Sequence, residues 1–281
     1  MKIGFIGAGK VVFSLGKFFS QGGIPVTGYY SRHRESAQEA AEFTGTKQYD
    51  KMEDLIQASD AIFLTVPDGA ISSVFEEIRE FTLTGKQICH CSGAMSVRDA
   101  FPGIEETGAF GYSIHPLFPV SSKYEAYREL PGAFFCLEGN GPQLDEWKDR
   151  LSSLGPTVQI IDGASKVRYH AACAISSNLI CALVQESLEL LESCGFTAEG
   201  ARKAITPLMR SNLDHIIEAG PVSALTGPVE RNDTTTVKKH LKCFPGEDDV
   251  ALYRAVSRKL VEVAQKKNPD RDYDPMKNLL K

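Results

Sequence analysis

The feature that most constrains the fold is a short apolar run that enters a glycine turn at residues 2–9, Lys-Ile-Gly-Phe-Ile-Gly-Ala-Gly. Residues 3–6 predict a buried parallel strand, and the glycines predict a tight turn that opens a helix over residues 10–19. Such a turn directs backbone N–H groups and the positive end of the helix dipole at a phosphate pair. The sequence therefore predicts a dinucleotide site, against the alternative of a structural turn that binds nothing. The residues expected to hold the pyrophosphate are Gly7, Ala8, Gly9, Lys10 and Val11.

The rest of the first half alternates apolar strands with helical segments. This rhythm is typical of a doubly wound, parallel α/β sheet that helices cover on both faces, and we expect it over residues 1–162. The strands are expected at residues 25–30, 61–66, 87–90, 112–115, 133–137 and 157–161.

After residue 162 the strand signals stop, and residues 163–281 are expected to form an all-α domain. A polar tail at 266–281 is expected to be poorly ordered or to lie over a neighbour. The helices are predicted at 165–192, at 198–219 with a kink or break at Pro207, from Asp233 onward, and at 248–265.

Composition narrows the possible partners. The net charge of −5 argues against nucleic acid or an anionic membrane as the main partner. The apolar stretch at 171–184 is judged too short and too polar to span a bilayer. The seven cysteines follow no disulfide or zinc spacing, which predicts a cytoplasmic protein without a structural metal.

The end of the second strand usually decides between the two nicotinamide cofactors. A carboxylate there binds the ribose 2′-OH of NAD, whereas arginine accommodates the 2′-phosphate of NADP. Here the positions are Ser31, Arg32 and Arg34, with no acid before Glu35. The sequence therefore favours NADP(H), against the alternative of a solvated basic loop.

The loop after the third expected strand, Val66-Pro67-Asp68, is predicted to lie along the cofactor, because ligands of open α/β sheets bind at the carboxyl ends of the strands. Asp68 is expected either to bind a ribose or to cap the next helix. Ser92 follows the next strand at the same edge, so it is a candidate for binding substrate or nicotinamide, or for capping a helix.

These pieces together resemble Rossmann-like proteins that carry the domain of unknown function DUF2520. That family is allied to coenzyme F420-dependent NADP oxidoreductases, pyrroline-5-carboxylate reductases and β-hydroxyacid dehydrogenases. Two positions depart from the family pattern: Val12 replaces the usual third glycine, and Asn232 stands where glycine is common. The segments that carry the resemblance are GAG (7–9), SR (31–32), TVPD (65–68), HCSGA (90–94), SIHPL (113–117), Lys166 with His170, SN (177–178) and TGPVERND (226–233).

The resemblance implies a helical domain similar to the C-terminal domain of 6-phosphogluconate dehydrogenase, and a catalytic lysine at the junction of the two domains. In similar β-hydroxyacid dehydrogenases a Lys-x-x-x-Asn pair exchanges a proton with the substrate oxygen and holds that oxygen. Lys166 matches the lysine, and His170 takes the place of the asparagine. Four residues apart, they share one helix face, which is equally compatible with a solvated first turn.

Further candidates for substrate binding are His115, Asn178 and Arg231. His115 ends a strand and either orients substrate or packs in the core. Asn178 lies eight residues after His170, so one continuous helix would place both on the same face. Arg231 is expected either to clamp a carboxylate or to belong to a turn capped by Asp233.

The sequence thus predicts an NADP(H)-dependent oxidoreductase that reduces a C=O or C=N group of a small, carboxylated or uncarboxylated molecule. Two alternatives stay open: hydride exchange between NADP and a deazaflavin, and a non-catalytic NADP-binding sensor or scaffold. Similar helical domains dimerise, so a homodimer is expected.

Overall fold

The computed structural model describes all residues from Met1 to Lys281. Contacts divide the chain into two compact units, Met1–Ser176 and Ser177–Lys281, and each is described by itself below. The first residues of the long helical region, up to Ser176, belong to the first unit by these contacts. The domain boundary expected between residues 162 and 163 stays a prediction.

The first unit contains one eight-stranded sheet with the order β3-β2-β1-β4-β5-β6-β7-β8. Its first six positions have the strand order of a doubly wound Rossmann sheet, so the predicted fold class is confirmed. The short strand β3 had no signal in the sequence. The strands are β1 (Ile3–Ile6), β2 (Val26–Tyr30), β3 (Lys47–Gln48), β4 (Ala61–Leu64), β5 (Gln87–His90), β6 (Phe110–Leu117), β7 (Phe134–Gly139) and β8 (Thr157–Ile160).

One pair of strands corrects the expectation of a parallel sheet. β7 pairs antiparallel with β6, in a register that places His115 opposite Cys136. The reason lies in residues 118–133, which contain only two 3-10 turns, Ala126–Arg128 and Leu130–Gly132. A parallel return normally needs a crossover helix, and this segment has none. The remaining pairs are parallel.

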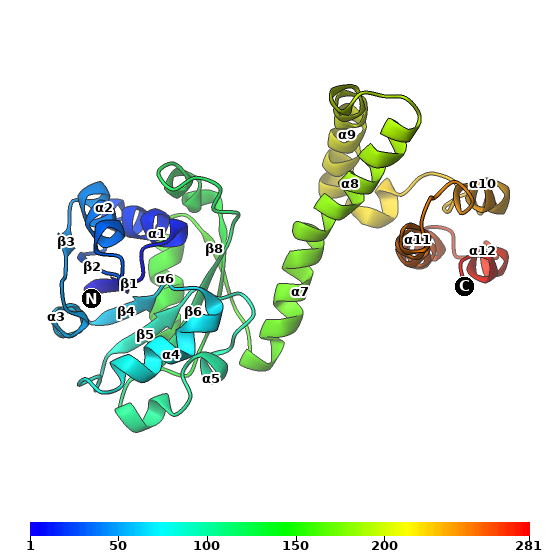
Figure 1. Cartoon of the computed structure of the whole chain (residues 1–281). Coiled ribbons are helices and arrows are strands. Elements are labelled where there is room, and N and C mark those ends of the chain that lie inside the picture. The colour runs from blue at the N-terminus through cyan, green and yellow to red at the C-terminus, as the bar shows by residue number, and fades with distance from the viewer. The chain divides into compact units, whose positions relative to one another are not determined.

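Helices cover the two faces of this sheet (Figure 1). α1, α2 and α6 contribute to the buried cluster on one face, and α3, α4 and α5 contribute to the cluster on the other. Neighbouring residues of β4 alternate between the clusters, with Phe63 in the first and Ile62 and Leu64 in the second. The helices of this unit are α1 (Lys10–Gln21), α2 (Arg34–Thr44), α3 (Met52–Ala58), α4 (Asp68–Ile78), α5 (Val97–Ala100), α6 (Leu144–Ser153) and α7 (Lys166–Ser176).

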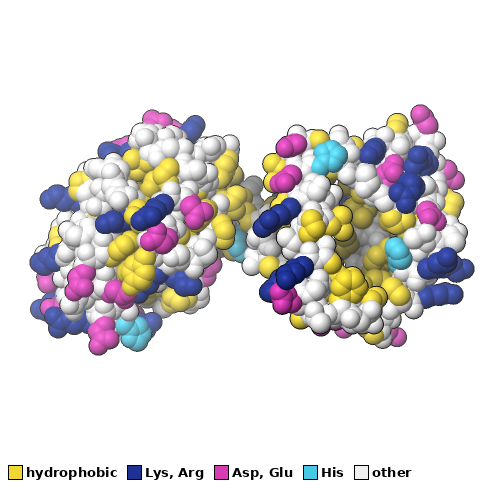
Figure 2. Space-filling model, turned by 90° about the horizontal axis from the view of Figure 1, so that it is seen from above, with side chains coloured by type: hydrophobic (Ala, Val, Ile, Leu, Met, Phe, Trp, Pro, Cys, Tyr) yellow, Lys and Arg dark blue, Asp and Glu magenta, His cyan; other side chains and the backbone are white.

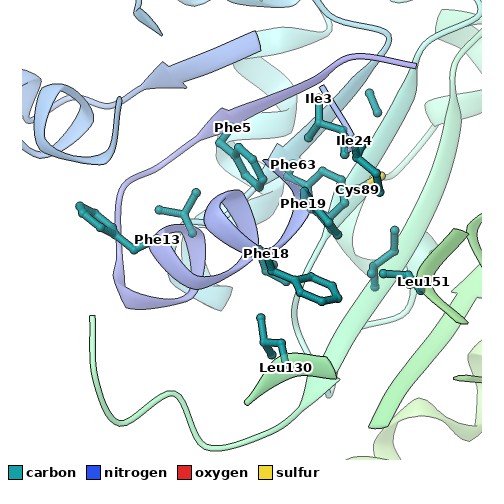
Figure 3. Close-up of a cluster of buried hydrophobic side chains, with 14 of the residues drawn as sticks. Ile3, Phe5, Phe13, Phe18, Phe19, Ile24, Phe63, Cys89, Leu130 and Leu151 are labelled. Carbon is teal, nitrogen blue, oxygen red and sulfur yellow. The ribbon is translucent and has the colours of Figure 1, made fainter. Parts of the chain in front are cut away.

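Aromatic rings fill the first of these clusters (Figure 3). Phe5 of β1 lies 5.4 Å from Phe63 of β4, and Phe19 of α1 lies 5.7 Å from Phe63, measured between ring centroids. Val12, at the position of the missing third glycine, is fully buried in the same cluster. The side chain at this position is therefore part of the packing that fixes α1 on the sheet, and with it the glycine turn before α1.

The single helix expected over 165–192 is two helices. α7 ends at Ser176, α8 (Asn178–Ser193) begins at Asn178, and Ser177 between them has φ −129° and ψ −73°, outside the helical region. The helical register therefore does not continue from His170 to Asn178, and the argument that they share one face does not hold.

The second unit is helical, as expected. Pro207 lies inside α9 without interrupting it, whereas Gly220, with φ +78°, interrupts this helix near its end. Asp233 caps α10 through a 3.0 Å bond from the backbone N–H of Thr236, which confirms the predicted N-cap. Besides α8, the helices are α9 (Ala198–Ala224), α10 (Thr234–His240), α11 (Glu247–Lys267) and α12 (Asp274–Leu279).

The tail at 266–281 is ordered and packs against neighbouring helices, so the alternative of a poorly ordered tail is wrong. α11 extends to Lys267, and α12 follows at Asp274–Leu279. Tyr273, Met276 and Leu280 are buried in one cluster with residues of α10 and α11. The tail is polar on average, but its few apolar residues are spaced so that they enter this core.

The stretch 171–184, judged too short and too polar to span a bilayer, lies within a longer helical run. The helical run Gly163–Ser193 contains an 18-residue window with a mean hydropathy of 1.3, and by length and composition alone it is sufficient to cross a bilayer. This run contains the break at Ser177, and none of its most apolar window is buried within the chain.

Hydrophobic side chains are visible in a hollow of the helical unit (Figure 2).

Candidate functional site

The glycine turn after β1 requires its first glycine. Gly7 has φ +107°, and its N–H donates to the carbonyl oxygen of Tyr30 at 2.8 Å. A Cβ at this position would lie 2.6 Å from the carbonyl oxygen of Thr65 at the end of β4. The turn is therefore closed between the ends of β2 and β4, at the switch point of the sheet.

The second glycine has a different role. Gly9 is the N-cap of α1, it forms no side-chain cap bond, and the first turn of α1 contains no acidic residue. A Cβ on Gly9 would meet no atom within 4 Å. The N-terminus of α1 is thus uncapped and opens onto free space, which is the arrangement that binds an anion.

A pocket of about 310 Å³ lies at this helix end. It brings together most of the residues predicted to hold the cofactor, from the ends of β1, β2 and β4. Lys10, Val11, Arg34 and Asp68 are predicted cofactor residues that do not line it. The lining consists of Ile6, Gly7, Ala8, Gly9, Tyr30, Ser31, Arg32, His33, Ser36, Met52, Thr65, Val66, Pro67, Val74 and Glu77.

The two arginines after β2 lie in different surroundings. Arg32 lines the pocket, whereas the guanidinium of Arg34 forms an exposed ion pair with Asp50 at 3.2 Å. His33 and Ser36 line the pocket as well, and neither was predicted from the sequence. Ser36 lies in the first turn of α2, which also contains the acidic residue Glu35.

The Ser92 side chain, just after β5, connects neighbouring segments through hydrogen bonds. Its hydroxyl donates to Asp68 at 2.6 Å, and it accepts bonds from the backbone N–H groups of Ala94 and Met95 at 3.2 and 3.1 Å. One donor and two acceptors exhaust the capacity of a hydroxyl group. Asp68, the first residue of α4, is therefore held by Ser92 across the sheet edge, and α4 has no side-chain cap bond.

Lys166 is buried at the start of α7, with only 1% of its surface exposed. Its Nζ donates to the carbonyl oxygen of Ser92 at 2.9 Å and to the hydroxyl of Ser113 at 2.7 Å. Burial lowers the pKa of this ammonium, and Cys136 and Glu138 oppose that effect. The structure thus places a desolvated lysine against the ends of β5 and β6, where a lowered pKa favours proton transfer.

Two histidines from strands lie near this lysine. His90, the last residue of β5, accepts a bond from the N–H of Ser92 at 3.2 Å, and burial together with the Lys166 charge lowers its pKa to about 3. Burial and the charges of Lys166 and His170 lower the pKa of His115 on β6 to about 4. Both rings are therefore neutral near pH 7.

The predicted partner His170 is exposed, and its ring lies 6.5 Å from the ring of His115. Tyr169, which the sequence analysis missed, joins the group through a 2.8 Å bond between its hydroxyl and Nδ1 of His115. Gly93 lies close to both histidine rings. A Cβ at this position would lie 2.6 Å from Cδ2 of His170 and 2.9 Å from Nε2 of His115.

Asn178 and Arg231 belong to the second unit, and their roles in substrate binding stay predictions. Asn178 is exposed at the start of α8 and accepts a bond from the Ser177 hydroxyl at 3.1 Å. Arg231 is exposed in the loop before α10. Next to it, Asn232 has φ +58°, a left-handed conformation that asparagine tolerates better than most residues. The substitution for glycine at this turn is thus accommodated.

Two family models cover most of the chain. Residues 1–116 match the Rossmann-like domain, and residues 133–260 match the domain of unknown function DUF2520. The chain therefore combines a Rossmann-like domain with a DUF2520 domain, as the sequence motifs predict. No curated protein matches the chain.

Solved structures support the same fold. A protein from Thermotoga maritima is 25% identical, with 94% of this chain and 99% of that one covered and a TM-score of 0.74. A protein from Bacteroides fragilis, described as an NADP oxidoreductase, is 21% identical, with 93% and 98% covered and a TM-score of 0.73. An imine reductase from Myxococcus stipitatus, solved in complex with NADP⁺, is 16% identical, with all of both chains covered and a TM-score of 0.64.

Proposed function

We propose that the protein is an NADP(H)-dependent oxidoreductase that reduces a C=O or C=N group of a small molecule by hydride transfer. The observation that carries this proposal is the pocket at the end of β1. There the uncapped N-terminus of α1 and the side chain of Arg32 line the same space. The N-terminus of α1 suits a pyrophosphate, and the guanidinium of Arg32 suits a 2′-phosphate.

The residues present fit this cofactor. The space beside Gly9 is open, so a phosphate can reach the N–H groups of α1 without displacing any side chain. Ser31 and Arg32 after β2 and Ser36 in the first turn of α2 offer two hydroxyls and a guanidinium, at the place where the 2′-phosphate of NADP is expected. The NADP⁺ bound to the imine reductase of the same fold agrees with this assignment.

Bound NADPH supplies the hydride, and the chain supplies the proton. Addition of hydride to C=O or C=N develops negative charge on the oxygen or nitrogen, which then needs a proton donor. We assign this role to the ammonium of Lys166, whose lowered pKa makes it a readier donor than an exposed lysine. We propose that His115 and His170, whose rings lie 6.5 Å apart, hold the substrate. A role of Asn178 and Arg231 in substrate binding stays a prediction.

One observation favours a second function. The Lys166 ammonium is buried and already donates to two protein oxygens, which is also what a purely structural lysine does. A protein that binds NADP(H) as a sensor or scaffold, without turnover, would keep the pocket at β1 and use Lys166 only to hold α7 against the sheet.

The two functions differ in one experiment. Calorimetry with NADPH is expected to show binding in both cases, whereas NADPH consumption with a panel of ketones, aldehydes and cyclic imines is expected only of the enzyme. Absence of binding by NADPH and NADP⁺ contradicts both functions. Binding without consumption of NADPH by any member of the panel supports the sensor.

We also propose that the protein is a homodimer formed through its helical unit. Long apolar side chains are exposed on α8 and α9, among them Leu179, Leu208 and Ile217 at 54, 71 and 73%. A second copy would cover such a surface and remove it from water. Light scattering is expected to give twice the 30.7 kDa of the chain. A monomer that associates with lipid vesicles would instead favour a membrane contact for the run 163–193.

A further inference from the structure

His115 and Tyr169 form a hydrogen-bonded pair beside the buried lysine. The imidazole comes from β6, the phenol comes from α7, and the Tyr169 hydroxyl lies 2.8 Å from Nδ1 of His115. The two rings meet edge to face, with centroids 5.7 Å apart and planes inclined at 84°. The contact thus fixes both the position and the rotation of the imidazole.

The direction of this bond follows from the groups around the phenol. Besides the imidazole, the Tyr169 hydroxyl has the thiols of Cys136 and Cys173 as side-chain partners. Sulfur is a weak acceptor, whereas a neutral imidazole nitrogen is a strong one. Of these acceptors the imidazole is the strongest, so the hydroxyl proton is placed on the bond to Nδ1 rather than on a thiol sulfur.

A neutral imidazole that accepts at Nδ1 must carry its proton on Nε2. Burial and the charges of Lys166 and His170 oppose a second proton on His115, and burial raises the pKa of Tyr169, which keeps its proton. Nε2 lies against Gly93, where any larger residue would contact it. Nε2 of His115 therefore lies beside the loop that follows β5, in which the Ser92 carbonyl oxygen accepts from Lys166.

We propose that Tyr169 holds His115 as the Nε2–H tautomer, and that the site consequently accepts a carbonyl compound rather than a protonated imine. This inference rests on the proposed oxidoreductase function and names its substrate class. A carbonyl oxygen has lone pairs that accept from Nε2–H and from Lys166. An iminium nitrogen has no lone pair to offer, and its positive charge is repelled by the Lys166 ammonium.

The step balances without any further reactant. The carbonyl carbon gains a hydride with both electrons from NADPH, and the π pair of the C=O bond moves to the oxygen. That oxygen takes a proton from the Lys166 ammonium and becomes a hydroxyl, and Lys166 regains a proton from water. His115 keeps its proton throughout and stabilises the charge that develops on the oxygen. Tyr169 is a positioning residue, since it acts through His115.

The tautomer can be measured directly by ¹⁵N NMR of the histidine rings in the full-length protein at neutral pH. The chain has six histidines, and the His115→Gln variant identifies the signals of His115 by their loss. We expect a protonated Nε2 and an unprotonated Nδ1 for His115. Signals of the Nδ1–H tautomer or of a charged ring would overturn the proposal, whatever the protein catalyses.

The chain offers a matched control for the tyrosine. Tyr253 makes the same kind of bond to His240 in the second unit, at 2.8 Å with ring planes at 90°. Tyr169→Phe is expected to mix the tautomers of His115 and leave those of His240 unchanged, and Tyr253→Phe is expected to do the reverse. If Tyr169→Phe leaves the His115 signals unchanged, Tyr169 does not set the tautomer.

Turnover tests the choice of substrate. The amide of glutamine can place an N–H near the position of Nε2, and that of asparagine nearer to Nδ1. His115→Gln is therefore expected to keep ketone reduction within about tenfold of the wild type, whereas His115→Asn loses about a hundredfold or more. Faster reduction of a cyclic imine below its own pKa, where it is an iminium, would overturn the substrate class. Loss of NADPH binding would instead contradict the proposed function itself, and the NMR result would still stand.

Discussion

The ammonium of Lys166 and the carbonyl oxygen of Ser92 are joined by a 2.9 Å hydrogen bond, which fastens the first residue of α7 to the loop after β5. The same loop is held from the other side by the 2.6 Å bond between Ser92 and Asp68 of α4. The proposed proton donor and the first turn of α4 are therefore connected through one serine. Its backbone holds the lysine, and its hydroxyl holds the aspartate.

Lys166→Met tests the role of this lysine, because methionine keeps the apolar stem and removes the ammonium. Turnover of a carbonyl substrate is expected to fall about a hundredfold or more, since the proton donor is lost. Binding of NADPH is expected to stay within about threefold, because Lys166 does not line the pocket at β1. Steady-state kinetics and calorimetry measure the two effects. Unchanged turnover would assign Lys166 a structural role only.

Substitution of the two glycines of the first turn by alanine is expected to affect different properties, protein stability for Gly7 and NADPH binding for Gly9. Gly7→Ala forces a Cβ to within 2.6 Å of Thr65 and strains a residue at φ +107°, so it should lower the free energy of unfolding by about 1–3 kcal/mol or more. Gly9→Ala meets no atom and should leave the unfolding free energy within about 1 kcal/mol. Its methyl group occupies the space proposed for the pyrophosphate, so NADPH binding should weaken about tenfold or more.

Chemical denaturation and calorimetry on both variants separate these effects. The structure would be contradicted at this turn by a Gly7→Ala protein as stable as the wild type. A Gly9→Ala protein with wild-type affinity would place the pyrophosphate elsewhere.

The neutral histidines predict how stability depends on pH. The pKa of His115 is lowered to about 4 in the folded chain, from an ordinary 6.5. Between these values the unfolded chain binds a proton that the folded chain does not, so the stabilisation is fully present above pH 6.5 and is lost as the pH falls toward 4. His90, with a pKa of about 3, acts in the same direction. Each contributes a slope of up to about 1.4 kcal/mol per pH unit.

The His115→Gln variant isolates one of these contributions. Its free energy of unfolding, measured by urea denaturation between pH 6 and 4.5, is expected to fall less steeply than that of the wild type. Burial raises the pKa of Glu138 and acts in the opposite sense, but it does so in both proteins and cancels in the comparison. Equal slopes in the two proteins would mean that His115 is charged in the folded chain.

Local signals were enough to predict seven of the eight strands and a group of residues that line the pocket at the end of β1. Gly7 and Gly9 follow an apolar strand, and the turn chemistry of glycine is determined by its immediate neighbours. The strand Gln87–His90 was predicted with its observed bounds for the same reason, because its apolar residues and its flanks are local. Asp233 was also recognised as a cap from its own type and position.

Features that depend on distant residues were missed. The antiparallel direction of β7 depends on the path of residues 118–133, and the order of the tail depends on Met276 entering a core made by other helices. The division between Arg32 and Arg34 depends on Asp50, which is remote in sequence. No periodicity in one segment reports such contacts.

In the candidate site, too, some residues could be predicted from local patterns and others only from contacts between distant segments. Lys166 and His170 were found from their spacing and a family pattern, whereas Tyr169 becomes significant only through its bond to His115 on β6. Asn178 was assigned to the face of His170 on the assumption of an unbroken helix, and the backbone of Ser177 breaks it. A polar cluster, Ser176-Ser177-Asn178, at that point was the available warning, because such side chains compete for backbone bonds.

The most direct test of the account is calorimetry of NADPH and NADH binding to the wild type and to Arg32→Ala and Arg34→Ala. We expect the wild type to prefer NADPH by about tenfold or more, Arg32→Ala to lose that preference, and Arg34→Ala to keep it, because only Arg32 lines the pocket. A wild type without affinity for NADPH, or an Arg32→Ala protein with the full preference, would contradict the account.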